Sequence, residues 1–466
     1  MHSIGMTNFY RIGSDSKVSI NKFDILRFWE SRGYRKLILK NGNYQLIKIS
    51  RNSIVEPIEE FRLIDEIRDY LEANEPHFDK VLNEFLKKDY VSRGIVNSLK
   101  SMTISFSYGS LDEAILFYKN GVLKITKEKF ELVPYEKYKG FIWKKQILDR
   151  DFINSDDFKN AEFSQFMFHL SGKDKDRFES LRSITGFLCH SYKDPSLNPA
   201  IVLIDEDIDL DSQEANGGKG KSLFARGLGN IIPMYFKEGK NISKSFPFSG
   251  FESHHRLMFY DDVKKDFEFE SLFSIMTGDF NVEKKYKNEE IIAFSESPKV
   301  LISSNYMLKG VKGFSTDRRK VEFEISGYYG KHKTPVQEFG HLLFDDWNKE
   351  EWSKFDSLMV FCIKEFLSKG IVTPKSINLE ENKLKFETHS KFVEFMDEKL
   401  KSKLSFIRKD LFDEFKNRYT QEFFYLTPQL FGKWLEIYAE KRRLHYHERK
   451  SNGNQIVEFG SIDNNE

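Results

Sequence analysis

Residues 213–224 read QEANGGKGKSLF and follow the apolar run Pro199 to Ile204. An apolar strand, a glycine-rich turn and a Lys-Ser pair that opens a helix together form a cradle for phosphate groups. Glycines let the backbone turn its N–H groups inward, and the helix N-terminus adds partial positive charge. The Lys221 ammonium is expected to reach the β- and γ-phosphates of ATP, and the Ser222 hydroxyl to bind Mg²⁺. The candidate ATP ligands are Gly217, Gly218, Lys219, Gly220, Lys221 and Ser222.

This turn departs from the full P-loop pattern in two respects. The pattern requires glycine six positions before Lys221, where this chain has Ala215. An acidic loop, 205–214, also separates the apolar run from the glycines. A solvated glycine-rich turn is the alternative interpretation, but the Gly-Lys-Ser ending after an apolar strand favours nucleotide binding.

The composition is typical of a globular chain with two or three domains, because 466 residues exceed the size of one compact core. The net charge is only +1, so contact with nucleic acid would depend on local basic patches. Cys189 and Cys362 lie far apart among apolar neighbours, which favours buried free thiols in a reducing compartment. With no bilayer-length apolar run and no signal-peptide pattern, we expect a cytoplasmic protein without membrane contact.

Two later apolar runs end in polar residues suited to an ATPase centre. One ends in Asp261-Asp262 and the other in Asn305. The carboxyl ends of parallel strands meet at one edge of a sheet, so these side chains are expected near Lys221. We assign Asp261 to the Mg²⁺ shell together with Ser222, and Asp262 to orienting the attacking water. The Asn305 amide would contact the γ-phosphate or that water.

A basic turn precedes the next apolar run, 321–325. Its paired arginines, Arg318 and Arg319, are placed to reach the nucleotide of a neighbouring subunit and stabilise charge in the transition state. A plain basic turn between two elements is an equally good interpretation of either arginine alone.

Residues 276–287 predict a β-hairpin that starts at a Gly-Asp turn. Three lysines surround one tyrosine in its second half: Lys284, Lys285, Tyr286 and Lys287. Lysine supplies charge for phosphate and tyrosine supplies a ring for stacking, so this segment suits a nucleic-acid backbone. The alternative is an ordinary exposed hairpin.

The last 80 residues predict three helices and a hairpin. Helical apolar stripes begin near Phe392, at Leu411 and at Thr427-Pro428, and two strand-like runs flank an Asn-Gly turn at 452–453. This order indicates a winged helix, a fold that binds DNA or protein. The basic cluster Lys441, Arg442 and Arg443 favours DNA.

Taken in order, these motifs resemble the superfamily 3 helicases, in particular their phage- and poxvirus-type primase-helicase branch. The resemblance covers about 114–366 and rests on 217–222 (Walker A), 260–262 (Walker B), 277–287 (the B′ hairpin), Asn305 (motif C) and Arg318-Arg319. It implies an AAA+-like ATPase core and a homo-oligomeric, usually hexameric, ring with nucleotide between subunits. It also implies translocation on single-stranded DNA, with Lys284 or Lys285 following the strand.

We therefore expect an ATP-dependent DNA helicase of viral, phage or mobile-element replication. It would act on single-stranded or forked DNA with ATP and Mg²⁺, in the host cytoplasm, and a separate primase or polymerase is a further expected partner. One alternative is a ring ATPase that serves as a regulatory, defence or loading scaffold without unwinding. Another is a bifunctional primase-helicase, which the first ~110 residues disfavour because they lack clustered acidic metal ligands.

The fold class expected from these observations is α/β, with five regions along the chain. They are an N-terminal α+β domain of unknown role (1–110), a helical or collar region (111–198), the ATPase core (199–370), a linker (371–386) and a winged-helix-like domain (387–466).

Overall fold

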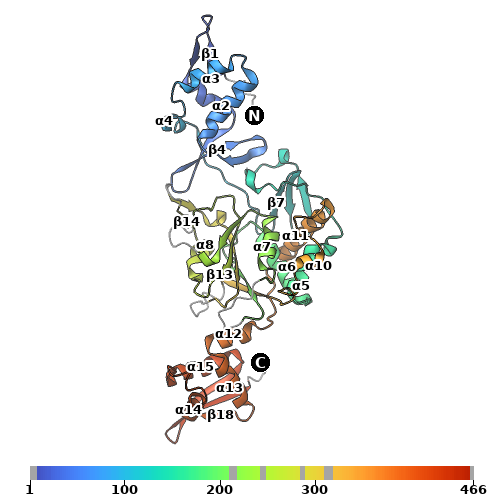
Figure 1. The fold of residues 1–466 in the computed structure, drawn as a ribbon, viewed down its shortest axis with the longest axis vertical. Helices are drawn as coiled ribbons and strands as arrows, with labels where there is room; N and C mark the ends of the chain where they lie inside the picture. The colour runs from blue at the N-terminus through green and yellow to red at the C-terminus, as the bar shows by residue number, and fades with distance from the viewer. Residues whose placement is uncertain (1–7, 209–217, 242–247, 284–288, 309–318, 462–466) are drawn as a thin grey trace.

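The computed structural model describes residues 8–208, 218–241, 248–283, 289–308 and 319–461. Figure 1 shows an elongated molecule with an N-terminal body, a central body built around a sheet, and a C-terminal body. Among the helices of these ranges, none is both long enough and apolar enough to cross a bilayer.

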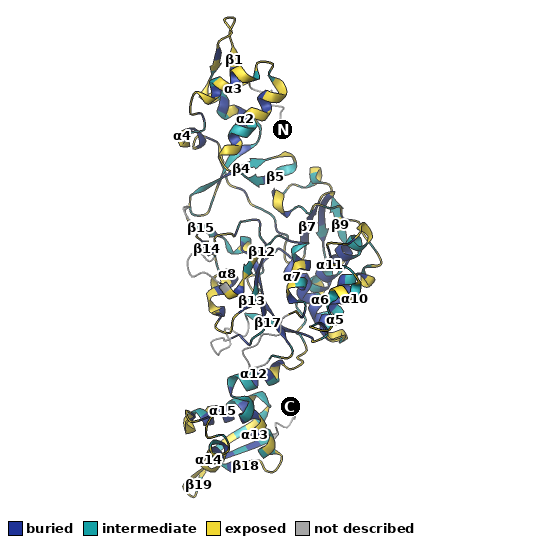
Figure 2. Cartoon of the chain, in the orientation of Figure 1, coloured by how far each residue is buried: buried dark blue, intermediate teal, exposed yellow. Residues whose placement is uncertain are grey.

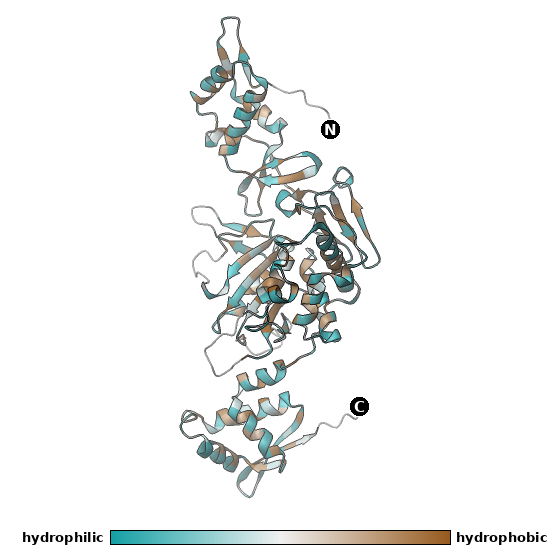
Figure 3. Cartoon of the chain, turned by 45° about the vertical axis from the view of Figure 1, so that its right-hand side comes forward, coloured by the Kyte–Doolittle hydropathy of each residue, from teal (hydrophilic) through white to brown (hydrophobic). Residues whose placement is uncertain are grey.

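The central body is organised around a five-stranded parallel sheet with the strand order β12-β13-β16-β11-β17. Its strands are β11 (Ala200–Asp205), β12 (Met234–Glu238), β13 (Leu257–Val263), β16 (Lys299–Ser304) and β17 (Lys320–Ile325). In β11, Ile201 and Leu203 pack into a core on one face, and Val202 and Ile204 into a core on the other. Burial on both faces explains the nearly continuous apolar runs, which Figure 3 shows in brown. Four of the strands were predicted; the edge strand β12 was not.

Helices cover one face of this sheet, and a short helix with a hairpin covers the other. The first face carries α5 (Glu162–Leu170), α6 (Lys175–Cys189), α7 (Lys221–Gly229) and α11 (Lys349–Lys369), next to the antiparallel strands β7 (Ala114–Tyr118), β8 (Gly121–Ile125) and β9 (Phe130–Val133). The second carries α8 (Phe273–Thr277), β14 (Phe280–Val282) and β15 (Glu290–Ile292). The short helix α10 (Pro335–Phe339) precedes α11.

Both cysteines lie in the core on the helical face. Cys189 and Cys362 are fully buried free thiols, as predicted. Burial raises the pKa of Cys189 to about 12, so this thiol is protonated and unreactive at neutral pH.

A buried ion pair joins the segment before α5 to α11. Arg150 Nη2 lies 2.6 Å from Asp356 Oδ1, and its Nε donates to Oδ2 at 2.9 Å. The Asp356 side chain is only 1% exposed. Replacing Arg150 by alanine would leave this carboxylate buried without its counter-charge.

We expect Arg150→Ala to lower the free energy of unfolding by about 3–5 kcal/mol, the usual cost of removing one partner of a buried ion pair. Chemical denaturation followed by tryptophan fluorescence measures the effect. The matched control is Arg226→Ala, because Arg226 pairs with Asp345 at the surface, where both side chains are almost half exposed. Its effect should be much smaller, and equal effects from both variants would contradict the structural role given to Arg150.

The N-terminal body has helices on a second mixed sheet with the order β10-β5-β4-β3-β6. Its elements are β1 (Tyr10–Ile12), β2 (Val18–Ile20), α1 (Lys22–Ser31), β3 (Tyr34–Ile38), β4 (Tyr44–Ile49), β5 (Ile54–Pro57), α2 (Phe61–Asn74), α3 (Phe78–Leu86), α4 (Arg93–Val96), β6 (Ser101–Met102) and β10 (Ile142–Trp143). The predicted Asn-Gly hairpin is formed by β3 and β4, and Gly42 has φ +81°. Strand β10 pairs in parallel with β5 and so belongs to this sheet. It lies after residue 110, where the sequence predicted the N-terminal domain to end.

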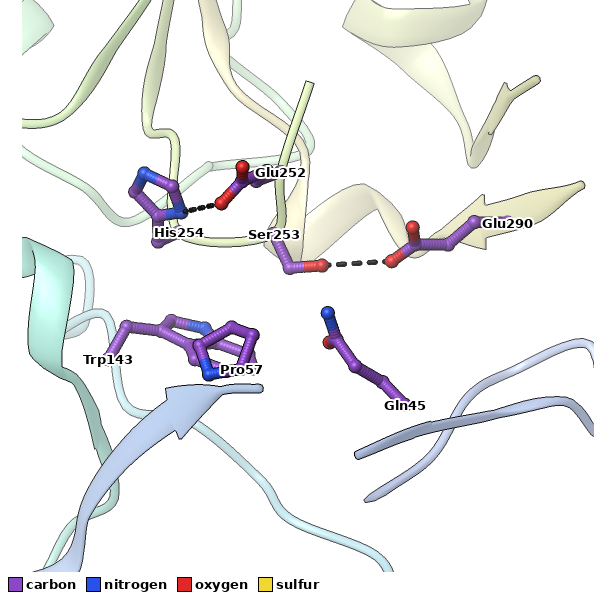
Figure 4. Close-up of a pocket in the computed structure, with 7 residues that line it drawn as sticks. All are labelled: Gln45, Pro57, Trp143, Glu252, Ser253, His254 and Glu290. Carbon is purple, nitrogen blue, oxygen red and sulfur yellow. Dashed lines mark hydrogen bonds and ion pairs between the residues drawn. The ribbon is translucent and has the colours of Figure 1, made fainter. Parts of the chain in front are cut away.

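This N-terminal sheet rests against the β14–β15 hairpin of the central body. The turn between β3 and β4 supplies the contact: Lys40 forms an ion pair with Asp279, and the Asn41 amide donates to the Glu289 carbonyl. Beside it, Gln45, Pro57 and Trp143 face residues 252–254 and Glu290 across a cavity of about 10 Å³ (Figure 4). Ser253 Oγ donates to Glu290 Oε1 at 2.9 Å on the far side of that cavity.

The C-terminal body has three helices and a three-stranded antiparallel sheet. Its elements are α13 (Ser390–Leu400), β18 (Ser405–Ile407), α14 (Arg408–Arg418), α15 (Pro428–Lys441), β19 (Leu444–Ser451) and β20 (Asn454–Ser461). The Thr427 side chain caps α15 by accepting from the Leu430 N–H at 3.2 Å. The three predicted helices and the hairpin are confirmed, and β18 is an additional strand. Figure 2 shows the buried helix faces turned inward.

The segment predicted as a linker is partly helical. Residues Leu379–Glu387 form α12, in which Leu379 and Leu384 are buried. Leu379 packs into the central core and Leu384 into the C-terminal core. These two leucines let a mostly polar segment connect the two bodies as a packed helix.

Candidate functional site

The carboxyl ends of β11, β13 and β16 bring the predicted acids and amide together. These strands are neighbours in the sheet and run parallel, so their last residues lie along one edge. Asp205 ends β11, Asp261 and Asp262 lie near the end of β13, and Asn305 follows β16. Helix α7 begins at Lys221 beside the same edge, which places Lys221 and Ser222 in contact with these residues.

The glycine-rich turn adopts a backbone conformation that favours glycine. Gly218 and Gly220 have φ +94° and +99°, in the left-handed region. A Cβ added to Gly220 would lie 3.0 Å from side-chain atoms of Phe166 and Leu170 on α5. At Gly220, therefore, both the positive φ and the limited space beside α5 disfavour any residue larger than glycine.

The Lys221 ammonium lies between a carboxylate and an amide. Its Nζ is 2.7 Å from Asp205 Oδ1 and donates to Asn305 Oδ1 at 2.6 Å. The side chains of Lys221 and Asp205 are 9% and 4% exposed. Burial lowers the pKa of Lys221 and raises the pKa of Asp205, while their mutual attraction opposes both shifts. A cation in this position can bind an anion that approaches along the turn.

The Ser222 hydroxyl and the Asp261 carboxylate form the second cluster. Ser222 Oγ lies 2.9 Å and 3.0 Å from the two carboxylate oxygens of Asp261. Ser303 Oγ, from β16, donates to Asp261 Oδ1 at 2.7 Å and accepts from the Asp262 N–H at 2.8 Å. Ser303 therefore fixes the positions of both acids.

Asp262 has an unusual backbone conformation, with φ +55°. The pairing of β13 with β16 shifts register between Tyr260 and Val263, and this irregularity turns the Asp262 side chain toward the site. Its carboxylate accepts from Asn305 Nδ2 at 2.7 Å and forms an ion pair with Lys240. A non-glycine residue in the left-handed region costs energy, which is typical of functional positions.

Next to Ser222 there is a hollow of about 350 Å³. Its lining residues are Ser222, Arg226, Gly229 and Asn230 of or just after α7, and Met234, Phe236 and Phe259 of the sheet. Its volume is in the range of small-molecule sites.

Three residues of this site were not predicted: Asp205, Ser303 and Lys240. Asp205 directly follows a predicted apolar run, in the same way as Asp261 and Asn305, so the signal was present in the sequence. Ser303 belongs to a predicted strand, and only its register beside β13 shows its role. Lys240 follows β12, the strand that periodicity did not reveal.

Arg319 lies at the opposite end of the sheet from Lys221. It directly precedes β17, and its carbonyl accepts from the N–H of Ala200, the first residue of β11. At about 3.3 Å per residue, the six-residue strand β11 separates it from Asp205 by roughly 17 Å. Its guanidinium lies over the Phe273 ring, 4.5 Å from the centroid. Arg319 therefore does not contact the Lys221 site of its own chain.

The basic cluster at the end of α15 is largely engaged with carboxylates. Arg442 contacts Glu381 at 2.7 Å and Asp397 at 2.9 Å, and Lys441 lies 3.9 Å from Glu387. These pairs connect α15 to α12 and α13. Arg443 has φ +54° and is exposed in the turn after α15. The remaining predicted site residues, Gly217, Lys284, Lys285, Tyr286, Lys287 and Arg318, lie outside the described residues.

Comparison with known proteins gives only distant similarities. No protein-family model matches the chain, and no curated protein matches it. The apo structure of the C-terminal region of NrS-1 aligns with a TM-score of 0.42 and 13% sequence identity, over 94% of this chain and 98% of that chain. A JCV helicase with a bound thiazolopyridine compound aligns with a TM-score of 0.27 and 14% identity, over 44% of this chain and 55% of that chain.

Proposed function

We propose that this chain is an ATP-dependent DNA helicase, with its ATPase centre at the carboxyl edge of the central sheet. One observation carries the proposal. Lys221, Asn305 and Asp262 form one continuous series of hydrogen bonds, and Ser222, Asp261 and Ser303 form a second beside it. Residues from three separate motifs, each expected to serve ATP hydrolysis, thus meet in one place.

The residues at this edge fit ATP and Mg²⁺. In the proposal, the turn ending at Gly220 acts as a P-loop whose N–H groups and Lys221 hold the phosphates. The Ser222 hydroxyl and the Asp261 carboxylate supply the hard oxygen ligands that Mg²⁺ prefers. Bound Mg²⁺ would neutralise charge on the phosphate oxygens.

The remaining residues would assist the attack of water on the terminal phosphate. A bond forms from the water oxygen to phosphorus as the bond to the ADP oxygen breaks, and the water proton is released. Asp262 is proposed to orient and polarise that water, and Asn305, which contacts both Lys221 and Asp262, to sense the γ-phosphate. Arg318 or Arg319 would act on the nucleotide of a neighbouring subunit. Arg319 lies too far from the Lys221 site of its own chain to act there.

The ring and the DNA contacts complete the proposal. A homo-oligomer, in the simplest form a hexamer, would bind nucleotide between subunits and single-stranded or forked DNA in its channel. The tip of the β14–β15 hairpin would contact that DNA. The C-terminal body has the element order of a winged helix, in which Arg443 is a better phosphate contact than the carboxylate-bound Arg442.

The first test is ATP hydrolysis by the wild-type chain with and without single-stranded DNA, with blunt duplex DNA as the matched control. We expect single-stranded DNA to stimulate hydrolysis and the duplex not to do so. A forked-duplex unwinding assay follows. Hydrolysis that is indifferent to both DNAs would contradict the motor and favour a regulatory or scaffolding ring ATPase.

A further inference from the structure

The ion pair between Lys221 and Asp205 carries an inference about how nucleotide leaves the site, and it rests on the proposed function. Asp205 is the last residue of β11, which is paired with β16 on one side and β17 on the other. Its strand is thus held between two neighbouring strands, and its side chain is 4% exposed. The carboxylate therefore stays beside the phosphate position whether or not nucleotide is present.

Asp205 neutralises the cation that phosphate needs. The Lys221 ammonium contacts the Asp205 carboxylate at 2.7 Å, so the pair has no net charge. The other lysine of the turn, Lys219, pairs with Asp207, but the Asp207 side chain is 60% exposed, so water screens its charge. Phosphate must therefore compete with a fixed carboxylate for Lys221, and the negative charge of Asp205 repels phosphate at close range.

We propose that Asp205 is a positioning residue that recaptures Lys221 from the nucleotide and thereby promotes product release. With ATP bound, Lys221 turns toward the phosphates. After hydrolysis and loss of the γ-phosphate, fewer negative charges hold Lys221, and the buried carboxylate draws the ammonium back. ADP is then held by the turn alone and dissociates.

The proposal predicts a gain of affinity from removing a buried charge. In Asp205→Asn the competing carboxylate is gone, so ADP should bind more tightly, on the order of tenfold, the effect of one unit charge near a partly buried anion. Because release slows, kcat for ATP hydrolysis should fall, and KM should fall with it. A residue that merely supports the fold would instead weaken nucleotide binding.

The measurement is titration with a fluorescent ADP analogue, combined with steady-state hydrolysis. The matched control is Asp207→Asn, because the Asp207 side chain is 60% exposed and its charge is screened by water. Its ADP affinity should stay within about twofold of wild type. Wild-type protein that binds neither ATP nor ADP would refute the proposed function itself rather than this inference.

Two outcomes would overturn the inference. One is weaker ADP binding by Asp205→Asn at an unchanged melting temperature, which would mean that Asp205 holds Lys221 ready for phosphate. The other is failure of both Asp205→Asn and Asp205→Ser to fold, which would make Asp205 a structural counter-ion. Tighter ADP binding with slower turnover in either variant would support it.

Discussion

Lys221→Ala is expected to abolish ATP hydrolysis, with kcat lowered by at least about 100-fold. Lys221 is the cation of the turn that the structure places against both Asn305 and the strand-end acids. Without it, the terminal phosphate loses its charge partner, and Asn305 loses the donor that orients its amide. The measurement is phosphate release at saturating ATP, with and without single-stranded DNA. Residual hydrolysis near the wild-type rate would contradict the assignment of this site.

A matched control is needed because alanine also leaves Asp205 without its counter-charge. An unpaired buried carboxylate costs several kcal/mol of stability, so loss of activity could reflect unfolding. The double variant Lys221→Ala with Asp205→Asn removes both charges and should regain much of the stability. We expect it to melt near the wild-type temperature and still not hydrolyse ATP. If the double variant recovered hydrolysis, Lys221 would be structural only.

Replacing Lys284 and Lys285 by alanine is expected to abolish unwinding of a forked duplex while basal ATP hydrolysis stays within about twofold of wild type. The reason is that their positions in the sequence fall between β14 and β15, two strands that pack on the face of the sheet opposite the helices α5, α6, α7 and α11. The ATPase residues come from other elements, so the two functions should separate. Strand displacement and ATP hydrolysis are measured on the same preparation.

The control for this variant is Lys87→Ala with Lys88→Ala, which removes the same charge from two exposed lysines at the end of α3. It should unwind DNA at the wild-type rate. Unwinding retained by the hairpin variant would refute the DNA-tracking role of the hairpin, and equal losses in both variants would indicate a general charge effect.

The sequence predicted the parts of this molecule that local patterns encode. The apolar runs predicted the strands β11, β13, β16 and β17. The polar residues at the ends of two of these runs identified Asp261, Asp262 and Asn305 as candidate site residues. Cap chemistry located the start of α15 at Thr427-Pro428. These features depend on residues close together in the chain, so periodicity and turn rules detect them.

The remaining features depend on contacts between distant segments. Ser303 contacts the two acids only because β16 pairs with β13. Lys240 reaches Asp262 only because it follows the edge strand β12, which pairs with β13. The pairing of β10 with β5 joins segments on either side of the predicted boundary at residue 110. Residues 375–385 were predicted to be a linker because the segment is mostly polar. Its two leucines, Leu379 and Leu384, are too few to produce a detectable helical periodicity.

The interior position of β11, between β16 and β17, has a consequence for synthesis of the chain. β11 is made first, but its two partners begin at Lys299 and Lys320. At about 5–20 residues per second, the ribosome needs roughly 5 to 20 s to supply on the order of 100 further residues. Throughout that time the nascent apolar strand has two open edges, which invite pairing with other chains. The folded yield is therefore expected to depend on chaperones and on growth temperature.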